Sequence, residues 1–216
     1  MSDQTREIFG WIAAVVSFTA YLPYIIEYVG GGTKTHPLTR WMWRYLGLRG
    51  DTNPHQASWM IWAALQYVIF ASSVSQGVSA PAFIVLGYLI GSSTNAILLF
   101  WYGEKKWGWV DLGCGTLAIA GLFLLYLTKD AFLALLLAIA TDALGAIPTV
   151  VGVTKSPKDE GRAGWTMFLI GALVNLLAIK TWNFQEAGYT LYLILVIGYV
   201  CLNVWRPRKN EKHSNH

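Results

Sequence analysis

The chain has 216 residues, of which 55% are hydrophobic and 13% are charged, and its formal net charge at pH 7 is +4. Soluble domains carry about a quarter charged residues, so this composition excludes an ordinary soluble protein and indicates a membrane protein. The basic residues are spread over several loops instead of forming one patch, which argues against a nucleic-acid partner.

Apolar segments follow one another along most of the chain. Each is roughly 17 to 23 residues long, enough to cross a ~30 Å hydrocarbon core as a helix. Helices are expected because backbone polar groups in lipid must be satisfied within the segment itself. The sequence therefore predicts an all-α polytopic membrane protein with seven transmembrane helices, at 10–29, 57–76, 80–102, 109–127, 131–153, 163–180 and 188–205.

The first of these spans is expected to stay in the protein, because the residues before it are balanced in charge and no A-x-A cleavage site ends it. Seven crossings place only Arg6, Lys129 and Lys180 on one side of the membrane. The remaining thirteen of the 16 Lys and Arg residues lie on the other side. The positive-inside rule then predicts a multi-pass protein of the cell inner (plasma) membrane, with its N-terminus outside and its C-terminus in the cytoplasm.

The first three and the last three spans share three features. Each triplet has a proline late in its first helix, a tryptophan at the start of its second and an asparagine inside its third. These pairs are Pro23 and Pro148, Trp59 and Trp165, and Asn95 and Asn203. The fourth span has no counterpart, and one extra crossing is what a parallel duplication of three helices requires. The sequence thus predicts 3+1+3 parallel triple-helix-bundle repeats, an architecture that places substrate sites at the repeat interface.

The predicted division of the chain follows from this pattern. A first triple-helix bundle covers 1–108, a linker helix covers 109–128, and a second bundle covers 129–205. Within the first bundle, arginines and tryptophans interleave in a cytoplasmic loop at 30–56, which favours a short interfacial segment on anionic lipid. A flexible cytoplasmic tail is expected at 206–216.

Asp142 is the one carboxylate deep inside a predicted span. A lone ionisable group there costs ~2.5 to 3.5 kcal/mol on insertion scales, so we expect it to face a cavity or a partner. One interpretation is proton coupling, or recognition of a cationic or hydroxylated solute. The other is a carboxyl hydrogen-bonded to Asn175 or to a hydroxyl on a neighbouring helix. The matching position in the first half, aligned on the prolines, is Ser17.

The asparagines and prolines each allow two interpretations. Asn95 and Asn203 are expected to face one shared cavity, where their amides suit neutral, hydroxyl-rich or amide-bearing solutes. The alternative is hydrogen bonding between packed helices. Pro23 and Pro148 give either a static kink or a hinge between two states of the protein.

Aromatic side chains at the start of the middle helices are further candidates for a pocket. Trp59, Trp62 and Trp165 either anchor their helices at the membrane interface or stack on a sugar or heterocyclic ring. Gln66 lies one turn below Trp62 and adds a polar contact, and Asn175 joins the substrate-binding candidates from the sixth span.

Three helices with a late proline in the first (YLPYI and AIPTV), a tryptophan opening the second and an asparagine in the third resemble the SWEET and SemiSWEET sugar transporters of the PQ-loop, or MtN3-like, superfamily. The resemblance spans about 9–205. It implies alternating access between two bundles for a small polar solute, most readily a sugar, with Pro23 and Pro148 as hinges and Asn95 and Asn203 in the pocket. Related alternatives are a PnuC-like vitamin or nucleoside transporter, an amino-acid transporter, and a non-transporting receptor or scaffold.

No catalytic constellation is present in the sequence. It has no glycine-rich phosphate loop, no intramembrane His-Glu metal motif, and no serine or cysteine with an obvious histidine base. Cys114 and Cys201 lack C-x-x-C spacing, and the last span has no lysine for a retinal Schiff base. We therefore expect no enzyme, no cofactor and no metal; the expected partners are a small-molecule solute and the lipid bilayer, with homo-oligomerisation left open.

Overall fold

The computed structural model describes residues 1–29, 56–78, 80–102, 109–128, 130–155, 157 and 160–206. The basic and aromatic loop predicted at 30–56, apart from Gln56, and the tail beyond Arg206 lie outside these residues.

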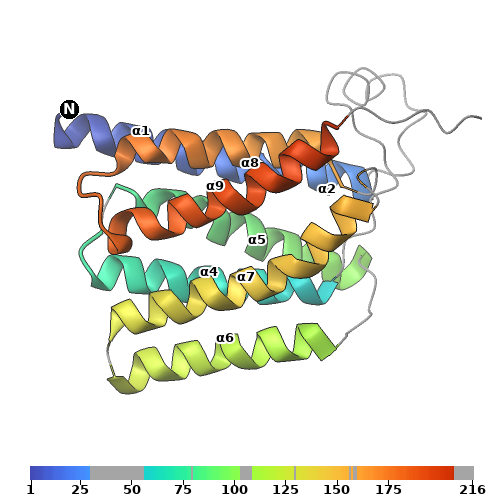
Figure 1. The fold of residues 1–216 in the computed structure, drawn as a ribbon, viewed down its shortest axis with the longest axis horizontal. Coiled ribbons are helices and arrows are strands. Elements are labelled where there is room, and N and C mark those ends of the chain that lie inside the picture. The colour runs from blue at the N-terminus through green and yellow to red at the C-terminus, as the bar shows by residue number, and fades with distance from the viewer. Residues whose placement is uncertain are drawn as a thin grey trace, which may run out of the picture.

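The described residues fold into helices joined by turns (Figure 1), so the all-helical prediction is confirmed. Each predicted span coincides with one helix or with two consecutive ones: α1 and α2 share the first, and α8 and a short 3₁₀ turn share the sixth. In chain order the elements are α1 (Asp3–Thr19), α2 (Tyr21–Val29), α4 (Gln56–Ser75), α5 (Ala82–Tyr102), α6 (Trp109–Thr128), α7 (Ala131–Lys155), α8 (Arg162–Asn175), η3 (Leu176–Ala178) and α9 (Phe184–Val204).

Length and composition make three of the described helices long and apolar enough to cross a membrane. The qualifying segments are Ala82–Trp101, Phe132–Lys155 and Phe184–Val204, and two shorter apolar helices accompany them at Trp59–Ser75 and Arg162–Ala178. These helices indicate a multi-pass membrane protein. The full count of seven crossings and the orientation of the termini stay predictions.

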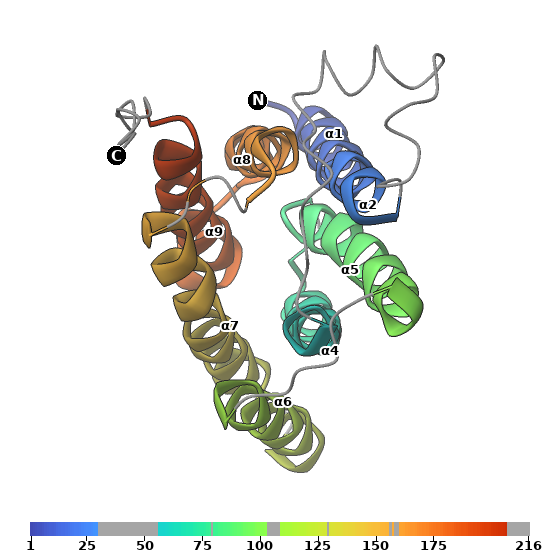
Figure 2. The same ribbon diagram turned by 90° about the vertical axis from the view of Figure 1, so that its right-hand side faces the viewer.

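Six helices form a closed ring when the molecule is viewed along its long axis (Figure 2). Around the ring the order is α1, α8, α9, α7, α4 and α5, and each helix packs on the next, with α5 closing onto α1. Helix α2 extends the path of α1 and contacts α5 and α8, whereas α6 lies outside the ring against α7 and α4. Helices that are far apart in the sequence therefore turn their inner faces toward one another.

Small residues allow α1 to approach its two neighbours in the ring closely. A Cβ added at Gly87 of α5 would collide with the backbone of Ala14, and one added at Gly171 of α8 would collide with the hydroxyl of Ser17. Ala14 and Ser17 are both buried. Without a hydrophobic force between helices in lipid, such close backbone packing is a main source of association. Helix α1 thus joins α5, from the N-terminal part of the chain, to α8, from the C-terminal part.

The two prolines lie in different helical contexts. The first span is interrupted at Ala20, and α2 begins at Tyr21, two residues before Pro23. Proline has no N–H to bond the carbonyl four residues earlier, so Pro23 cannot donate to Thr19, the last residue of α1. Pro148 lacks the same hydrogen bond, but α7 runs from Ala131 to Lys155 as one helix. The hinge role of both prolines stays a prediction.

The packing of α1 predicts opposite effects for the same substitution at two glycines. Gly87→Ala should destabilise the fold by about 1–3 kcal/mol, because the new methyl group overpacks against the backbone of α1. Gly113→Ala in α6 is the matched control, since a Cβ there meets nothing within 4 Å and alanine is the better helix former. Thermal unfolding in detergent micelles measures both. Equal melting temperatures for the two variants would contradict the close α1–α5 contact.

Candidate functional site

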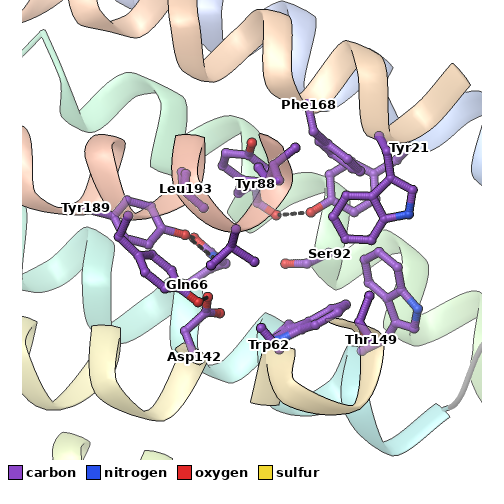
Figure 3. A pocket seen from close by; sticks show the side chains of 16 residues that line it. Tyr21, Trp62, Gln66, Tyr88, Ser92, Asp142, Thr149, Phe168, Tyr189 and Leu193 are labelled. Carbon is purple, nitrogen blue, oxygen red and sulfur yellow. Dashed lines mark hydrogen bonds between the residues drawn. The ribbon is translucent and has the colours of Figure 1, made fainter. Parts of the chain in front are cut away.

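A cavity lies among the inner faces of the ring helices (Figure 3), with an empty volume of about 600 Å³ that includes its part open to solvent. The 16 side chains that line it come from α2, α4, α5, α7, α8 and α9. Residues from the N-terminal part of the chain therefore face residues from the C-terminal part across one space.

Half of the lining side chains are aromatic. Tyr21 of α2 lies edge-on to Trp59 of α4, with 5.7 Å between ring centroids, and edge-on to Phe168 of α8 at 4.9 Å. Trp59 in turn lies edge-on to Trp62 at 5.0 Å. Edge-to-face pairs at these distances are favourable, so these four rings form a continuous wall, and Tyr189 and Tyr192 form a separate stacked pair. The eight aromatic lining residues are Tyr21, Trp59, Trp62, Tyr88, Trp165, Phe168, Tyr189 and Tyr192.

Asp142 faces this cavity from α7 and is only 8% exposed. The hydroxyl of Tyr192 on α9 donates a hydrogen bond to its Oδ2 atom at 2.5 Å. The carboxyl thus has a hydroxyl partner on a neighbouring helix, as the second interpretation expected, and it also borders the cavity; proton coupling and solute recognition stay predictions. Asn175 is not that partner: its Nδ2 atom donates to Thr190 at 2.8 Å and to the carbonyl of Pro81 at 3.2 Å.

A second buried polar pair connects α4 and α9 next to Asp142. Gln66 donates from Nε2 to the hydroxyl of Tyr189 at 2.8 Å. Tyr189 also stacks with Tyr192 at 6.2 Å between ring centroids. Figure 3 shows Gln66, Tyr189 and Asp142 gathered at one end of the cavity, away from Thr149 and Tyr21. The carboxylate, the amide and their tyrosine partners are therefore concentrated at one end, whereas the hydroxyls of Ser92 and Thr149 lie away from them.

Five of the predicted site residues line the cavity: Trp59, Trp62, Gln66, Asp142 and Trp165. Trp59 is 5% exposed and Trp165 is 9% exposed, so neither ring lies at a lipid-facing surface. Their placement favours the pocket interpretation over interfacial anchoring. Trp165 also donates from its indole nitrogen to Glu160 at 2.7 Å, which fixes the orientation of its ring.

The three predicted asparagines are buried but do not line this cavity. Asn203 donates from Nδ2 to the carbonyl of Tyr199, one turn earlier in α9, at 2.9 Å. Asn175 bridges to Thr190, as described above, and Asn95 is fully buried within α5. A substrate-binding role for these side chains stays a prediction that the contacts of Asn175 and Asn203 do not support.

The tyrosines of the cavity were not anticipated from the sequence. Tyr189 and Tyr192 are three residues apart in α9, and this spacing places two side chains on one face of a helix. That face packs toward α7, which carries Asp142. The spacing was the available signal, but tyrosine in a membrane helix is equally typical of an interfacial anchor.

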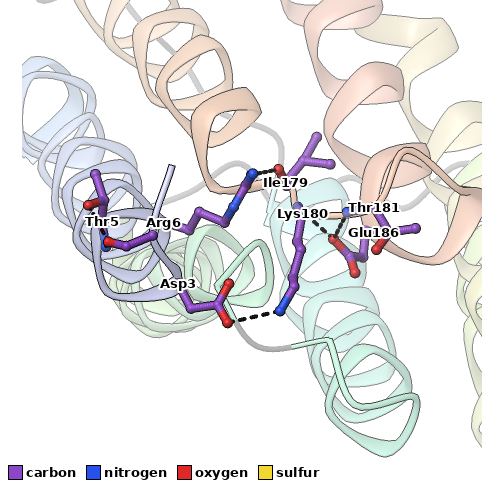
Figure 4. Close-up of polar contacts among 8 residues, drawn as sticks. Asp3, Thr5, Arg6, Ile179, Lys180, Thr181 and Glu186 are labelled. Carbon is purple, nitrogen blue, oxygen red and sulfur yellow. Dashed lines mark hydrogen bonds and ion pairs between the residues drawn. The ribbon is translucent and has the colours of Figure 1, made fainter.

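Charged and polar contacts connect α1 to the α8–α9 connection at the end where α1 begins (Figure 4). Lys180 forms an ion pair with Asp3 at 2.9 Å, and its ammonium group holds the pKa of that carboxyl below its usual value. Arg6 donates a hydrogen bond to the carbonyl of Ile179. Glu186 accepts from the backbone N–H groups of Lys180 and Thr181, both at 2.8 Å. These contacts hold that end of the ring together.

Within the part of the chain that the structure describes, no group of three or more His, Cys, Asp or Glu residues could hold a metal ion. Among the cavity-lining residues there is also no Lys, Arg or His. The lining offers aromatic faces, two hydrogen-bonded side-chain pairs, one of which contains the carboxylate of Asp142, and the hydroxyls of Tyr21, Tyr88, Ser92 and Thr149. These groups suit binding and positioning of a solute.

The Tyr192–Asp142 contact predicts a stability difference between two conservative variants. Tyr192→Phe should lower stability by about 1–3 kcal/mol, because it leaves a buried carboxylate oxygen without its donor. Asp142→Asn keeps an acceptor and removes a buried charge, so it should leave stability unchanged or raise it. Thermal unfolding in detergent measures both, with Tyr67→Phe at an exposed position as the control. A Tyr192→Phe variant as stable as the Tyr67→Phe control would contradict the contact.

No protein family, curated protein or solved structure matches this chain. The likeness to SWEET-type transporters therefore remains a resemblance in a few motif residues, and the function has to follow from the cavity and from the arrangement of the helices around it.

Proposed function

We propose that this chain is a membrane transporter that moves a small organic solute by alternating access between two triple-helix bundles. The observation that carries the proposal is the cavity, which helices from both parts of the chain line inside a ring of apolar helices. A site of this kind between repeats is typical of secondary transporters.

The order of helices in the ring supports two equivalent bundles. In the proposed repeat, α1, α4 and α5 correspond to α7, α8 and α9. The ring order is α1, α8, α9, α7, α4, α5, so each helix lies directly opposite its counterpart. Replacing every helix by its counterpart therefore gives the same ring, rotated by half a turn. Within each bundle the third helix contacts both of the others. Helices α1 and α7 also run in the same direction in Figure 1, as parallel repeats require. The helix outside the ring, α6, is then the linker between the repeats.

The proposed bundles meet mainly where α1 packs on α8 and where α4 packs on α7, and α2 and α5 make smaller contacts with α8. At the end where α1 begins, the Asp3–Lys180 ion pair and the Arg6–Ile179 hydrogen bond also cross from one bundle to the other. Opening the cavity toward that end requires these contacts to break. We therefore interpret the structure as a state closed at the end where α1 begins.

A sugar-like substrate, as implied by the family resemblance, stays a prediction. A neutral pyranose would stack on the indoles of Trp59 and Trp62. Its hydroxyls would, however, compete with the hydrogen bond that Gln66 and Tyr189 already make to each other. A neutral solute also gives the carboxylate of Asp142 no counter-charge. Vitamins, nucleosides and amino acids remain alternatives for the same cavity. A receptor on this fold would bind its ligand without moving it.

Uptake into proteoliposomes tests transport directly. Vesicles that contain the purified chain should accumulate at least one member of a panel of sugars, nucleosides, amino acids and organic amines faster than empty vesicles do. Ala146→Trp should reduce that uptake to the level of empty vesicles, because Ala146 is buried and lines the cavity. Ile119→Trp, on the exposed face of α6, is the size-matched control. Binding of a solute without flux would favour the receptor alternative.

Linking the two bundles at their closed end should stop the cycle. In a variant without native cysteines, Asp3→Cys and Lys180→Cys place two thiols at a contact that joins the bundles. A short bis-methanethiosulfonate reagent, which attaches to each thiol through a disulfide, should then abolish uptake, and reduction of these disulfides should restore it. Each single cysteine variant should keep its uptake after the same treatment. Undiminished uptake by the linked protein would contradict movement at this end.

A further inference from the structure

We propose that the solute recognised by the cavity is an organic cation, with Asp142 as its counter-charge and the surrounding aromatic rings as its cage. This inference rests on the transport function proposed above and names the chemical class of the solute.

The charge balance of the cavity is the first argument. Asp142 is buried, and the neutral hydroxyl of Tyr192 is its hydrogen-bond partner. None of the 16 lining residues is a Lys, Arg or His. A carboxylate buried in a membrane protein is costly unless a positive charge or a proton accompanies it. A cationic solute supplies the positive charge that the lining lacks.

The aromatic wall is the second argument. Cations bind over the faces of tryptophan, tyrosine and phenylalanine within about 6 Å of the ring centre, and the attraction is stronger where water is excluded. Trp62 and the stacked pair of Tyr189 and Tyr192 lie on the same cavity as Asp142. Aromatic cages of this composition are the usual recognition mode for quaternary ammonium groups.

The commitment of the polar side chains beside Asp142 is the third argument. Gln66 bonds Tyr189, and Tyr192 bonds Asp142, so two pairs of lining side chains use their hydrogen-bonding groups on one another. A polyhydroxylated solute needs many partners, and hydroxyls left unpaired in a buried site lose affinity. A methylated ammonium group needs no hydrogen bonds and gains from both the rings and the charge. The end of the cavity that holds Asp142 therefore favours a cation with an apolar surface over a sugar, and the hydroxyls of Ser92 and Thr149 lie away from that end.

Isosteric pairs of probes test this inference without requiring transport. Choline is compared with its neutral isostere 3,3-dimethyl-1-butanol, and benzylamine is compared with benzyl alcohol. The purified full chain in detergent is titrated with each probe, and calorimetry together with the fluorescence of the cavity tryptophans reports binding. At least one cation should bind about tenfold more tightly than its neutral partner, a difference of about 1.4 kcal/mol.

Variants assign the preference to Asp142. Asp142→Asn should bring the affinities of the cation and its isostere to within about twofold, whereas Asp142→Glu should keep part of the preference. Asp130→Asn is the matched control, because it removes an exposed carboxylate that caps α7 and asparagine caps equally well. An equal preference in Asp142→Asn and in the unmodified chain would overturn the assignment of Asp142.

The outcomes separate this inference from the proposed function. Equal binding, or no binding, of cation and isostere in both pairs overturns the cation inference, even if vesicles take up a neutral solute. Preferential binding of a cation with no flux of that cation into vesicles supports the site but overturns transport. A preference for neutral solutes that strengthens as Asp142 is protonated at lower pH would show that a proton, and not the solute, balances this charge.

Discussion

The burial of one carboxylate inside a ring of apolar helices is the constraint on which the cavity depends. Asp142 cannot face lipid without a large penalty, so α7 has to turn this residue inward. There the hydroxyl of Tyr192 meets it, which aligns α9 against α7. Tyr192 and Tyr189 lie on the same face of α9, and Tyr189 brings Gln66 of α4 to the same place. One buried charge thus orients three helices that come from both ends of the chain.

The same residue makes the two proposed bundles unequal. By the proline alignment, the counterpart of Asp142 is Ser17, which is buried where α1 packs against Gly171 of α8. The corresponding position thus holds a small side chain at a close helix contact in one half and an ionisable group on a cavity in the other. In the proposed duplicated scaffold, one charge would give a polar or charged solute a single preferred orientation in the cavity. The chemical asymmetry of the proposed transporter would then come from the position at which its two halves differ.

The sequence allowed the helices to be predicted more completely than the cavity. Apolar segments of about twenty residues set the helix positions because the bilayer imposes that length. Trp59 and Trp165 could be singled out by their positions at the start of the middle helices, and Asp142 by the free-energy cost of placing a carboxylate in the membrane. Which face of each helix points inward could not be predicted from the sequence, because membrane helices are apolar on all sides and have little amphipathic pattern. For this reason Tyr21 and Tyr192 were missed, and the buried amide of Asn203 was expected in the cavity although it bonds its own helix.

The contact of α1 with α8 also affects how the halves could move. Gly171 and Ser17 are small residues in close contact there. Because no long side chains interdigitate between these two residues, the two helix surfaces can rotate against each other at this point. In the proposed alternating-access cycle, this contact would be the pivot between the two bundles. Helix α7, with 25 residues, is about 38 Å long at 1.5 Å per residue. A rotation of about 10° around a point near mid-height then displaces the helix ends by roughly 3 Å, the width of a water molecule.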